Sequence, residues 1–410
     1  MAGAPPGDLE RFELEEFFAK HEFSAKYLMC CSDAETLKVS ELLAMADDEC
    51  RGLWENLTCG YTESEGLPIL RQEIAKDYPG VSHDDIFCFS GAEEGIYATM
   101  RSLLTKDDHC IVVTPCYQSL RSVASVVCGS LSTLELKRDE QWKLDIDALQ
   151  SLFKPNTAMV VMNFPHNPTG ALLTPDEQQA VVKLCRDHDV FLFFDEVYRG
   201  IELPGVDRLP PIASLYEKGI SLGVVSKSLG LAGLRIGWIA CRHKATLQTI
   251  AGYKHYLSIC NSAPSEILAL IALRSKDRIL KVNADIVARN TKLVEEFLAD
   301  PRFGRLFSWT APQAGCCSFM AFHGAEATAE TGSKSSEATA WLPIADEFVE
   351  SASVLTLPGH FFSPAQGDHF RVGLGRRNFP IVLEQFKAAV LAKFGDGSTT
   401  GGNGASRDAE

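Results

Sequence analysis

The sequence lacks the features of a protein that spans a membrane, binds nucleic acid or depends on disulfide bonds. It has no uninterrupted apolar run of about 18 residues, the length that a membrane-spanning helix needs. Its 39 Lys and Arg are outnumbered by 54 Asp and Glu, and the formal net charge of -15 disfavours binding to nucleic acid or anionic lipid. The 13 cysteines follow neither a disulfide framework nor a metal-binding spacing. We therefore expect no nucleic-acid partner, no membrane partner and no metal.

The start of the chain is acidic, and residues 1–16 contain no apolar stretch of the kind found in secretory signals. Scattered cysteines suit a reducing interior, where most act as small buried apolar side chains. Both observations predict a cytoplasmic protein. With 410 residues, of which 46% are hydrophobic, the chain can bury a large core and form more than one domain.

The fold class follows from seven apolar segments that alternate with helical patterns. Their apolar residues are continuous rather than alternating, which is typical of parallel strands buried on both faces. We predict a three-layer α/β/α sandwich around a mostly parallel seven-stranded sheet, with a smaller α+β domain beside it. The predicted strands lie near residues 86–89, 110–114, 131–136, 157–163, 190–195, 220–225 and 235–241.

The smaller domain is expected to be discontinuous in sequence. A long helix, from about residue 262 to 297, should lead out of the large domain into it. The predicted division assigns 1–50 to an N-terminal arm and part of the small domain, 51–280 to the large cofactor-binding domain, 281–394 to the C-terminal small domain, and 395–410 to a flexible tail rich in Gly, Ser and Thr.

One lysine and one arginine stand out in the apolar, glycine-rich run from Val224 to Trp238. The apolar neighbours of Lys227 desolvate its amine, which favours the neutral form that attacks an aldehyde. Arg235 offers a planar fork of donors that suits a phosphate. An aldehyde and a phosphate together describe pyridoxal 5'-phosphate. An exposed lysine in an ordinary loop before a strand is the alternative interpretation of this run.

A phosphate seat is predicted at the turn after the strand near 86–89. Gly91, Ala92 and Glu93 begin a helix that continues to about Leu104. The first backbone N–H groups of a helix have no intrahelical partner, and the helix dipole favours an anion there. The same turn could equally be a plain strand-to-helix connection.

Two further strands end in polar residues that suit the ring of this cofactor. Asp195 ends the strand near 190–195, and a carboxylate there would keep a pyridine nitrogen protonated, so that the ring withdraws electrons. The prolines at 165 and 168 restrict the backbone around Asn167, after the strand near 157–163. Both positions lie at the carboxyl ends of strands, where open α/β sheets bind ligands.

These motifs, in this order, resemble class I/II aminotransferases, the fold-type I pyridoxal-phosphate enzymes, from about Tyr61 to Arg371. The segment from Asn163 to Gly170 carries the family's NxPxNPTG pattern. The resemblance implies that Lys227 holds the cofactor as an internal aldimine and acts as general base and acid. It further implies that Asn167 and Tyr198 contact the phenolic oxygen of the cofactor, and that Tyr117 stacks on its ring.

The resemblance also implies a substrate site and a dimer. Arg371 matches the arginine that pairs with the substrate α-carboxylate, and its apolar neighbours in the sequence indicate a partly buried side chain. Tyr61 matches a tyrosine that is lent across a homodimer interface to the neighbour's phosphate. One position departs from the pattern: Val224 stands where many relatives carry a serine or threonine that holds the phosphate, and Ser226 or Ser228 would have to replace it.

The leading functional hypothesis is an aminotransferase that moves the α-amino group of an amino acid to a 2-oxo acid. The alternative is a cyclase, oxidase or lyase that uses the same residues to make the same carbanion. It is suggested by a similarity to the subgroup that contains capreomycidine synthase, and by the lyase reaction of aminocyclopropane carboxylate synthase. In that subgroup Asp33 and Glu35 would contact a basic substrate side chain, or else cap a helix that begins near Thr36.

Overall fold

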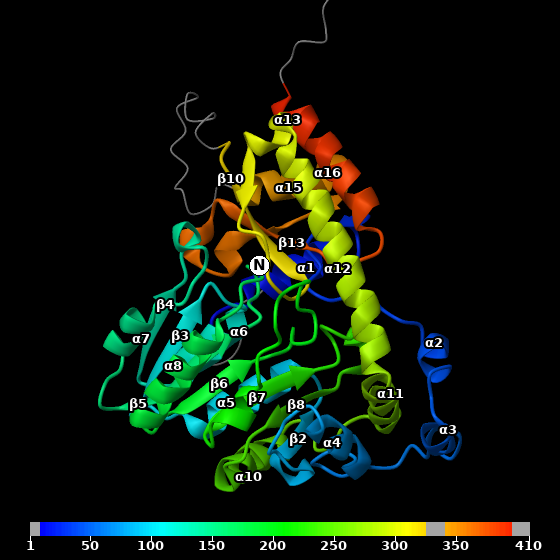
Figure 1. Ribbon diagram of the computed structural model, residues 1–410, viewed down its shortest axis with the longest axis vertical. Helices are drawn as coiled ribbons and strands as arrows, with labels where there is room; N and C mark the ends of the chain where they lie inside the picture. Colours follow the sequence, from blue (N-terminus) through cyan, green and yellow to red (C-terminus); the bar gives the residue numbers. More distant parts are fainter. Residues whose placement is uncertain (1–8, 325–340, 396–410) are drawn as a thin grey trace, which may run out of the picture.

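The computed structural model describes residues 9–324 and 341–395 and has a central sheet with helices on both faces (Figure 1). The sheet runs in the order β2 (Ile86–Phe89), β8 (Gly237–Ala240), β7 (Gly219–Val224), β6 (Phe191–Asp195), β5 (Thr157–Asn163), β3 (His109–Thr114) and β4 (Ser130–Glu135). All seven predicted strands are therefore present. The predicted α/β/α sandwich with a mostly parallel seven-stranded sheet is confirmed.

One strand makes the sheet mostly rather than wholly parallel. Strand β8 runs antiparallel to both β2 and β7, whereas β7, β6, β5, β3 and β4 pair in parallel. No α-helix separates β7 from β8; only a 3-10 turn, Ala232–Leu234, lies between them. Because β8 is reversed, Arg235 just before its start lies at the same edge of the sheet as the carboxyl ends of β5, β6 and β7.

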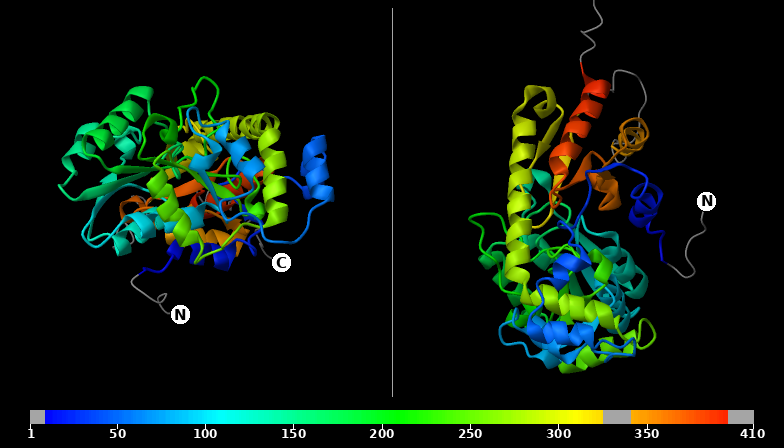
Figure 2. Two further views of the ribbon diagram at one scale, coloured as in Figure 1. Left: turned by 90° about the horizontal axis from the view of Figure 1, so that it is seen from below. Right: turned by 90° about the vertical axis from the view of Figure 1, so that its right-hand side faces the viewer.

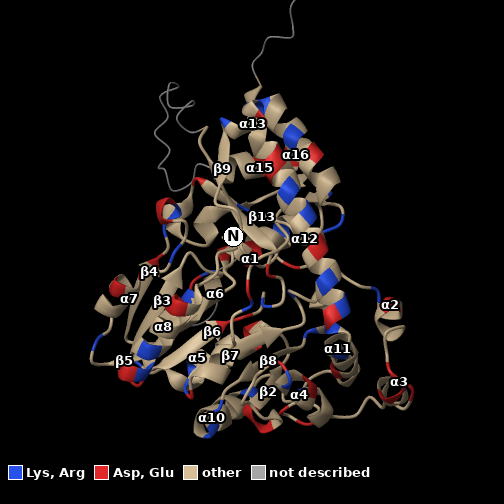
Figure 3. Cartoon of the chain, in the orientation of Figure 1, with Lys and Arg blue, Asp and Glu red and all other residues tan. Residues whose placement is uncertain are grey.

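Helices cover both faces of the sheet (Figure 1). The charges are concentrated on helices and connections (Figure 3), while the strands β2, β3 and β7 are fully buried. A helix with one apolar face packs in this way on a sheet. The helices of this part are α4 (Pro68–Ala75), α5 (Ala92–Leu103), α6 (Gln118–Val127), α7 (Ile146–Ser151), α8 (Pro175–Asp187), α9 (Ile212–Leu215) and α10 (Lys244–Lys254).

The predicted long helix consists of two helices. α11 (Ala263–Arg274) ends at Ser275, and α12 (Lys276–Ala299) begins directly after it. The backbone N–H of Ser275 donates to the carbonyls of Ile271 and Ala272, so the turn tightens where the direction changes. In two views α12 extends from the central sheet to the opposite end of the molecule (Figures 1 and 2).

A second sheet lies at that opposite end. Its antiparallel order is β12 (Leu357–Pro358), β13 (His369–Gly373), β10 (Cys317–Phe322) and β9 (Phe307–Trp309), and β1 (Tyr27–Leu28) pairs in parallel with β11 (Val354–Leu355). The remaining helices are α1 (Glu13–His21), α2 (Val39–Leu43), α3 (Asp48–Glu55), α13 (Pro301–Gly304), α15 (Leu342–Ala352) and α16 (Phe379–Phe394).

The predicted domain limits stay a prediction. Near the start of the chain, strand β1 lies in the region of the second sheet. Helices α2 and α3, by contrast, contact α11 and share a separate apolar core with it. The predicted tail, 395–410, lies outside the described residues except for Gly395. Within the described residues, we find no helix that is both long and apolar enough to span a bilayer.

Candidate active site

A cavity of about 530 Å³ opens at the edge of the central sheet where β5, β6 and β7 end. It is the place that the open-sheet rule predicts for a ligand. Nine of the predicted residues line it, although they come from six different segments of the chain: Ala92, Glu93, Tyr117, Asn167, Asp195, Tyr198, Ser226, Lys227 and Arg235.

One end of the cavity is built for an anion. Gly91, with φ of 94°, is the residue before α5, and a Cβ placed on it would lie 2.4 Å from Nη2 of Arg235. The guanidinium therefore lies directly against the start of the helix. Arg235 donates to the carbonyl of Ala232 at 3.2 Å and belongs to none of the ion pairs among the described residues. An arginine and a helix N-terminus side by side form a phosphate-binding arrangement.

The donors at this end differ in part from the expectation. The backbone N–H of Gly91 is not free, because it donates to the carbonyl of Phe89 at 2.8 Å. Ala92 and Glu93, the first residues of α5, remain in position to donate to an anion. The hydroxyl of Ser226 is buried and has no hydrogen-bond partner in the described part of the chain, whereas Ser228 donates to the carbonyls of Val197 and Arg199. Of the two serines, only Ser226 is available to replace the hydroxyl that Val224 lacks.

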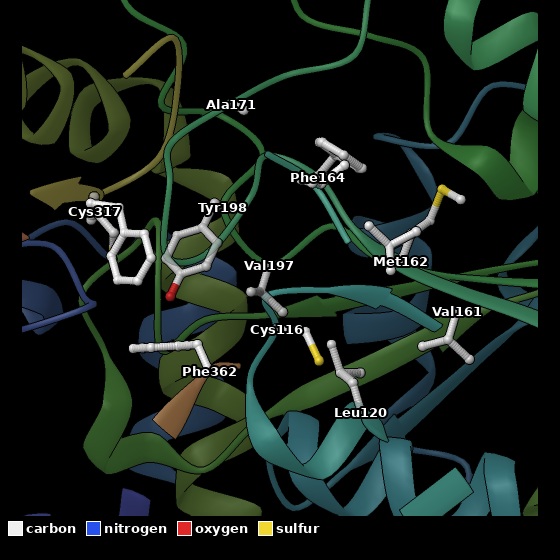
Figure 4. Close-up of a cluster of buried hydrophobic side chains, with 14 of the residues drawn as sticks. Cys116, Leu120, Val161, Met162, Phe164, Ala171, Val197, Tyr198, Cys317 and Phe362 are labelled. Carbon is white, nitrogen blue, oxygen red and sulfur yellow. The ribbon is translucent and has the colours of Figure 1, made fainter. Parts of the chain in front are cut away.

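The middle of the cavity carries the groups expected around a pyridine ring. Burial raises the pKa of Asp195 to about 6, while the N–H of Val197 and the charge of Lys227 act in the opposite direction. A positive charge bound beside this carboxylate would stabilise its ionised form. The hydroxyl of Tyr198 is buried and accepts or donates no hydrogen bond within residues 9–324 and 341–395, and its ring lies beside Cys317 and Phe362 (Figure 4).

Arg371 lies next to Asn167, one of the residues that line the cavity. Its side chain comes from β13 and is only 2% exposed. Nη1 donates to Oδ1 of Asn167 at 3.3 Å, Nε donates to the carbonyl of Cys30 at 3.0 Å, and the guanidinium lies over the rings of Phe18 and Phe362. None of the ion pairs among the described residues includes it. A buried guanidinium without a carboxylate is costly, so this geometry suits an incoming carboxylate.

The N-terminal segment supplies residues that the sequence did not reveal. Ser32 accepts a hydrogen bond from Nζ of Lys227 at 2.9 Å. Phe12 and Glu15, from α1 and the residue before it, line the cavity, and Glu15 accepts a hydrogen bond from the hydroxyl of Tyr117 at 2.6 Å. No local pattern could have found these contacts, because the partners are about 100 to 200 residues apart in the sequence.

Asp33, Glu35 and Tyr61 are not brought into the cavity. Asp33 pairs with Arg376 at 2.7 Å, and Glu35 accepts the backbone N–H of Arg377. The nearest helix, α2, begins at Val39 rather than near Thr36, so neither carboxylate caps it. The ring of Tyr61 is 91% exposed, and its role at a dimer interface stays a prediction.

The residues present fit pyridoxal phosphate. A lysine amine, an anion seat, a buried carboxylate and two buried hydroxyls without partners surround one cavity of suitable size. Fold and site together define a fold-type I enzyme that depends on this cofactor. Residues 54–375 match the model of the aminotransferase class I and II family, and the chain belongs to that family. The resemblance read from the motifs is thereby confirmed.

Characterised relatives are similar over most of their length. The chain is 26% identical to capreomycidine synthase from Streptomyces vinaceus over 399 residues, which is 96% of each chain. It is 25% identical to an arginine–pyruvate transaminase from Pseudomonas aeruginosa over 327 residues, 77% of each. A solved pyridoxal-phosphate-dependent aminotransferase from Streptococcus suis superimposes with a TM-score of 0.83 at 26% identity, covering 94% of this chain and 99% of that one.

Proposed function

We propose that this protein is an aminotransferase that moves the α-amino group of an amino acid to a 2-oxo acid. The observation that carries the proposal is that Arg371 donates to Asn167, which lines the same cavity as Lys227. A carboxylate bound by Arg371 would place the adjacent Cα within the cavity that Lys227 lines. The family match and the transaminases among the relatives support the same reaction.

Each residue has a role in this reaction. Pyridoxal phosphate, when bound, supplies the electron-withdrawing ring that makes the Cα proton acidic. Arg235 and the start of α5 hold the phosphate, and Asp195 keeps the pyridine nitrogen protonated. Arg371 orients the substrate by its carboxylate. The amine of Lys227 would take the proton from the substrate Cα as general base and then carry it as general acid.

The substrate side chain is proposed to be basic. Glu15 and Glu93 lie in the cavity near Tyr117, and neither belongs to an ion pair among the described residues. Burial raises the pKa of Glu93 to about 7, and the charges of Glu15 and Asp195 add to this. A cationic substrate side chain between Glu15 and Glu93 would offset the repulsion between these two carboxylates. The arginine named for one of the relatives has such a side chain.

The variant Glu15→Gln tests the side-chain preference. We expect its KM for arginine to rise about tenfold, with little change in kcat, because a charge-assisted contact is lost. Glu13→Gln, on the same helix and outside the cavity, is the matched control. An uncharged amino acid of similar length, norleucine, should show no change with either variant. An equal effect of Glu15→Gln on arginine and norleucine would refute the basic-substrate proposal.

A second candidate function is a cyclisation, oxidation or elimination of the amino acid. It is favoured by the similarity to capreomycidine synthase along 96% of the chain. The two candidates differ in what becomes of the amino group. A panel of amino acids is therefore incubated with the protein, followed by a 2-oxo acid, while the cofactor spectrum is recorded. Transamination requires loss of the visible absorbance and its recovery with the 2-oxo acid; no recovery with any 2-oxo acid would reject it.

The working unit is proposed to be a homodimer that shares Tyr61. The segment around Tyr61 lies against residues 255–261, because Ser64 donates to the carbonyl of Ile259 and Thr62 to that of Asn261. Both segments expose large side chains: Tyr61 and Tyr256 are each 91% exposed and Ile259 is 51% exposed. Exposed apolar clusters of this kind mark interfaces. Sedimentation of Ile259→Asp should give a monomer if this face forms the dimer, and an unchanged dimer would contradict it.

A further inference from the structure

Among the described residues, the amine of Lys227 has one side-chain hydrogen-bond partner, and it comes from outside the central sheet. Nζ donates to Oγ of Ser32 at 2.9 Å, although the two residues are 195 positions apart. Asp195, which lines the same cavity, forms no ion pair with Lys227 among the described residues. The hydroxyl of Ser32 is therefore the side-chain group to which this amine is hydrogen-bonded.

The segment that carries Ser32, residues 29–35, is held tightly against the loop of Lys227. The N–H of Ala34 donates to the carbonyl of Lys227 at 3.1 Å. Gly230 has a φ of 69°, and a Cβ on it would lie 2.1 Å from the carbonyl oxygen of Glu35. Such an approach is open only to glycine. The separation of Ser32 from Lys227 is thus set by backbone contacts of Ala34 and Glu35, which follow Ser32 in the sequence.

The opposite side of the same segment is held by the end of β13. Gly373 donates to the carbonyl of Met29 at 2.7 Å, and a Cβ on Gly373 would lie 2.0 Å from the carbonyl oxygen of Cys31. Arg371 donates to the carbonyl of Cys30 at 3.0 Å. The segment therefore connects the proposed carboxylate-binding arginine to the catalytic lysine, with Ser32 between them.

We propose that Ser32 is a positioning residue that holds the free amine of Lys227 for proton transfer at the substrate Cα. A neutral amine has two N–H groups and one lone pair. Because Ser32 accepts one N–H, the lone pair remains free to take the Cα proton, while the tether restricts where the amine can point. This inference rests on the proposed function, in which Lys227 moves that proton.

The test compares Ser32→Ala, Ser32→Thr and Thr36→Ala. Ser32→Ala is expected to lower kcat about tenfold with KM unchanged, the effect of losing one hydrogen bond in the transition state. The isotope effect on kcat with Cα-deuterated substrate should rise, because proton transfer becomes slower relative to other steps. Ser32→Thr, which keeps the hydroxyl, should recover most of the rate. Thr36→Ala removes an exposed hydroxyl from the adjoining chain and should behave as wild type.

A crystal structure of the cofactor-free protein gives a readout that does not depend on activity. Nζ of Lys227 should lie within hydrogen-bonding distance of Ser32 Oγ in the wild type and lose its fixed position in Ser32→Ala. A rise in KM alone, or an unchanged isotope effect, would overturn the positioning role. Loss of cofactor binding in the wild type would instead refute the proposed function, so the two failures are distinguishable.

Discussion

Replacing Asp195 by Asn should stabilise the cofactor-free protein against unfolding. It should also reduce the rise in melting temperature that pyridoxal phosphate causes. Burial raises the pKa of this carboxyl from its usual 3.8 to about 6. A shift of this size corresponds to a loss of about 3 kcal/mol in the free energy of unfolding when the carboxyl is ionised. Between these pH values the folded state keeps a proton that the unfolded state has released. Stability therefore falls as pH rises through this window, and the full cost is present above about pH 6.

The variant avoids that cost because an amide is neutral at every pH in this range. Its Oδ1 can still accept the N–H of Val197, which Asp195 accepts at 3.1 Å. Above about pH 6 cofactor-free Asp195→Asn should be more stable than the wild type by up to about 3 kcal/mol. The difference should shrink towards zero as pH falls to about 4. Thermal unfolding followed by circular dichroism across this pH range measures it.

The neighbouring Glu196 provides the matched control. It is also buried, its pKa is raised to about 7 by burial, and its carboxylate accepts the N–H of Ile212, but it does not line the large cavity. Glu196→Gln should gain stability in the same way and keep the full rise in melting temperature on adding pyridoxal phosphate. Asp195→Asn should show a smaller rise. Equal rises for both variants would refute the assignment of Asp195 to the pyridine nitrogen.

Two other variants test the ends of the cavity. Arg371→Lys keeps the charge but removes the planar fork, and we expect kcat/KM to fall by about 100-fold with the cofactor spectrum unchanged. Steady-state kinetics and an absorbance scan measure these two quantities. A fall in kcat/KM of less than about threefold would contradict a direct contact between Arg371 and the substrate carboxylate. Gly91→Ala places a Cβ 2.4 Å from the guanidinium of Arg235, in a backbone conformation that disfavours alanine. It should weaken cofactor binding by at least about tenfold in equilibrium titrations, and an unchanged affinity would show that the anion seat lies elsewhere.

The sheet and the residues at its strand ends could be predicted because each depends on a local pattern. The apolar run from Val190 to Phe194 is continuous, so a buried strand with Asp195 at its end follows from the sequence. Asn167 and Lys227 follow for the same reason. Parallel strands bring their carboxyl ends to one edge, which predicts that motifs distant in the sequence meet in a single site.

Three features could not be predicted, each for a physical reason. An apolar run does not record strand direction, so the sequence does not indicate that β8 is the reversed strand. The division between α11 and α12 at Ser275 has neither a proline nor a glycine to mark it. Ser32 and Glu15 reach the site through contacts of the N-terminal segment with distant parts of the chain, which leave no periodic pattern.

The most direct test of the account is to find where the cofactor is attached. The purified protein is incubated with pyridoxal phosphate, reduced with borohydride and digested, and the labelled peptide is identified by mass spectrometry. We predict a single pyridoxyl group on Lys227, lost in Lys227→Ala. A label on another lysine, such as the fully buried Lys254, or no label at all, would contradict the assignment of Lys227 as the catalytic residue.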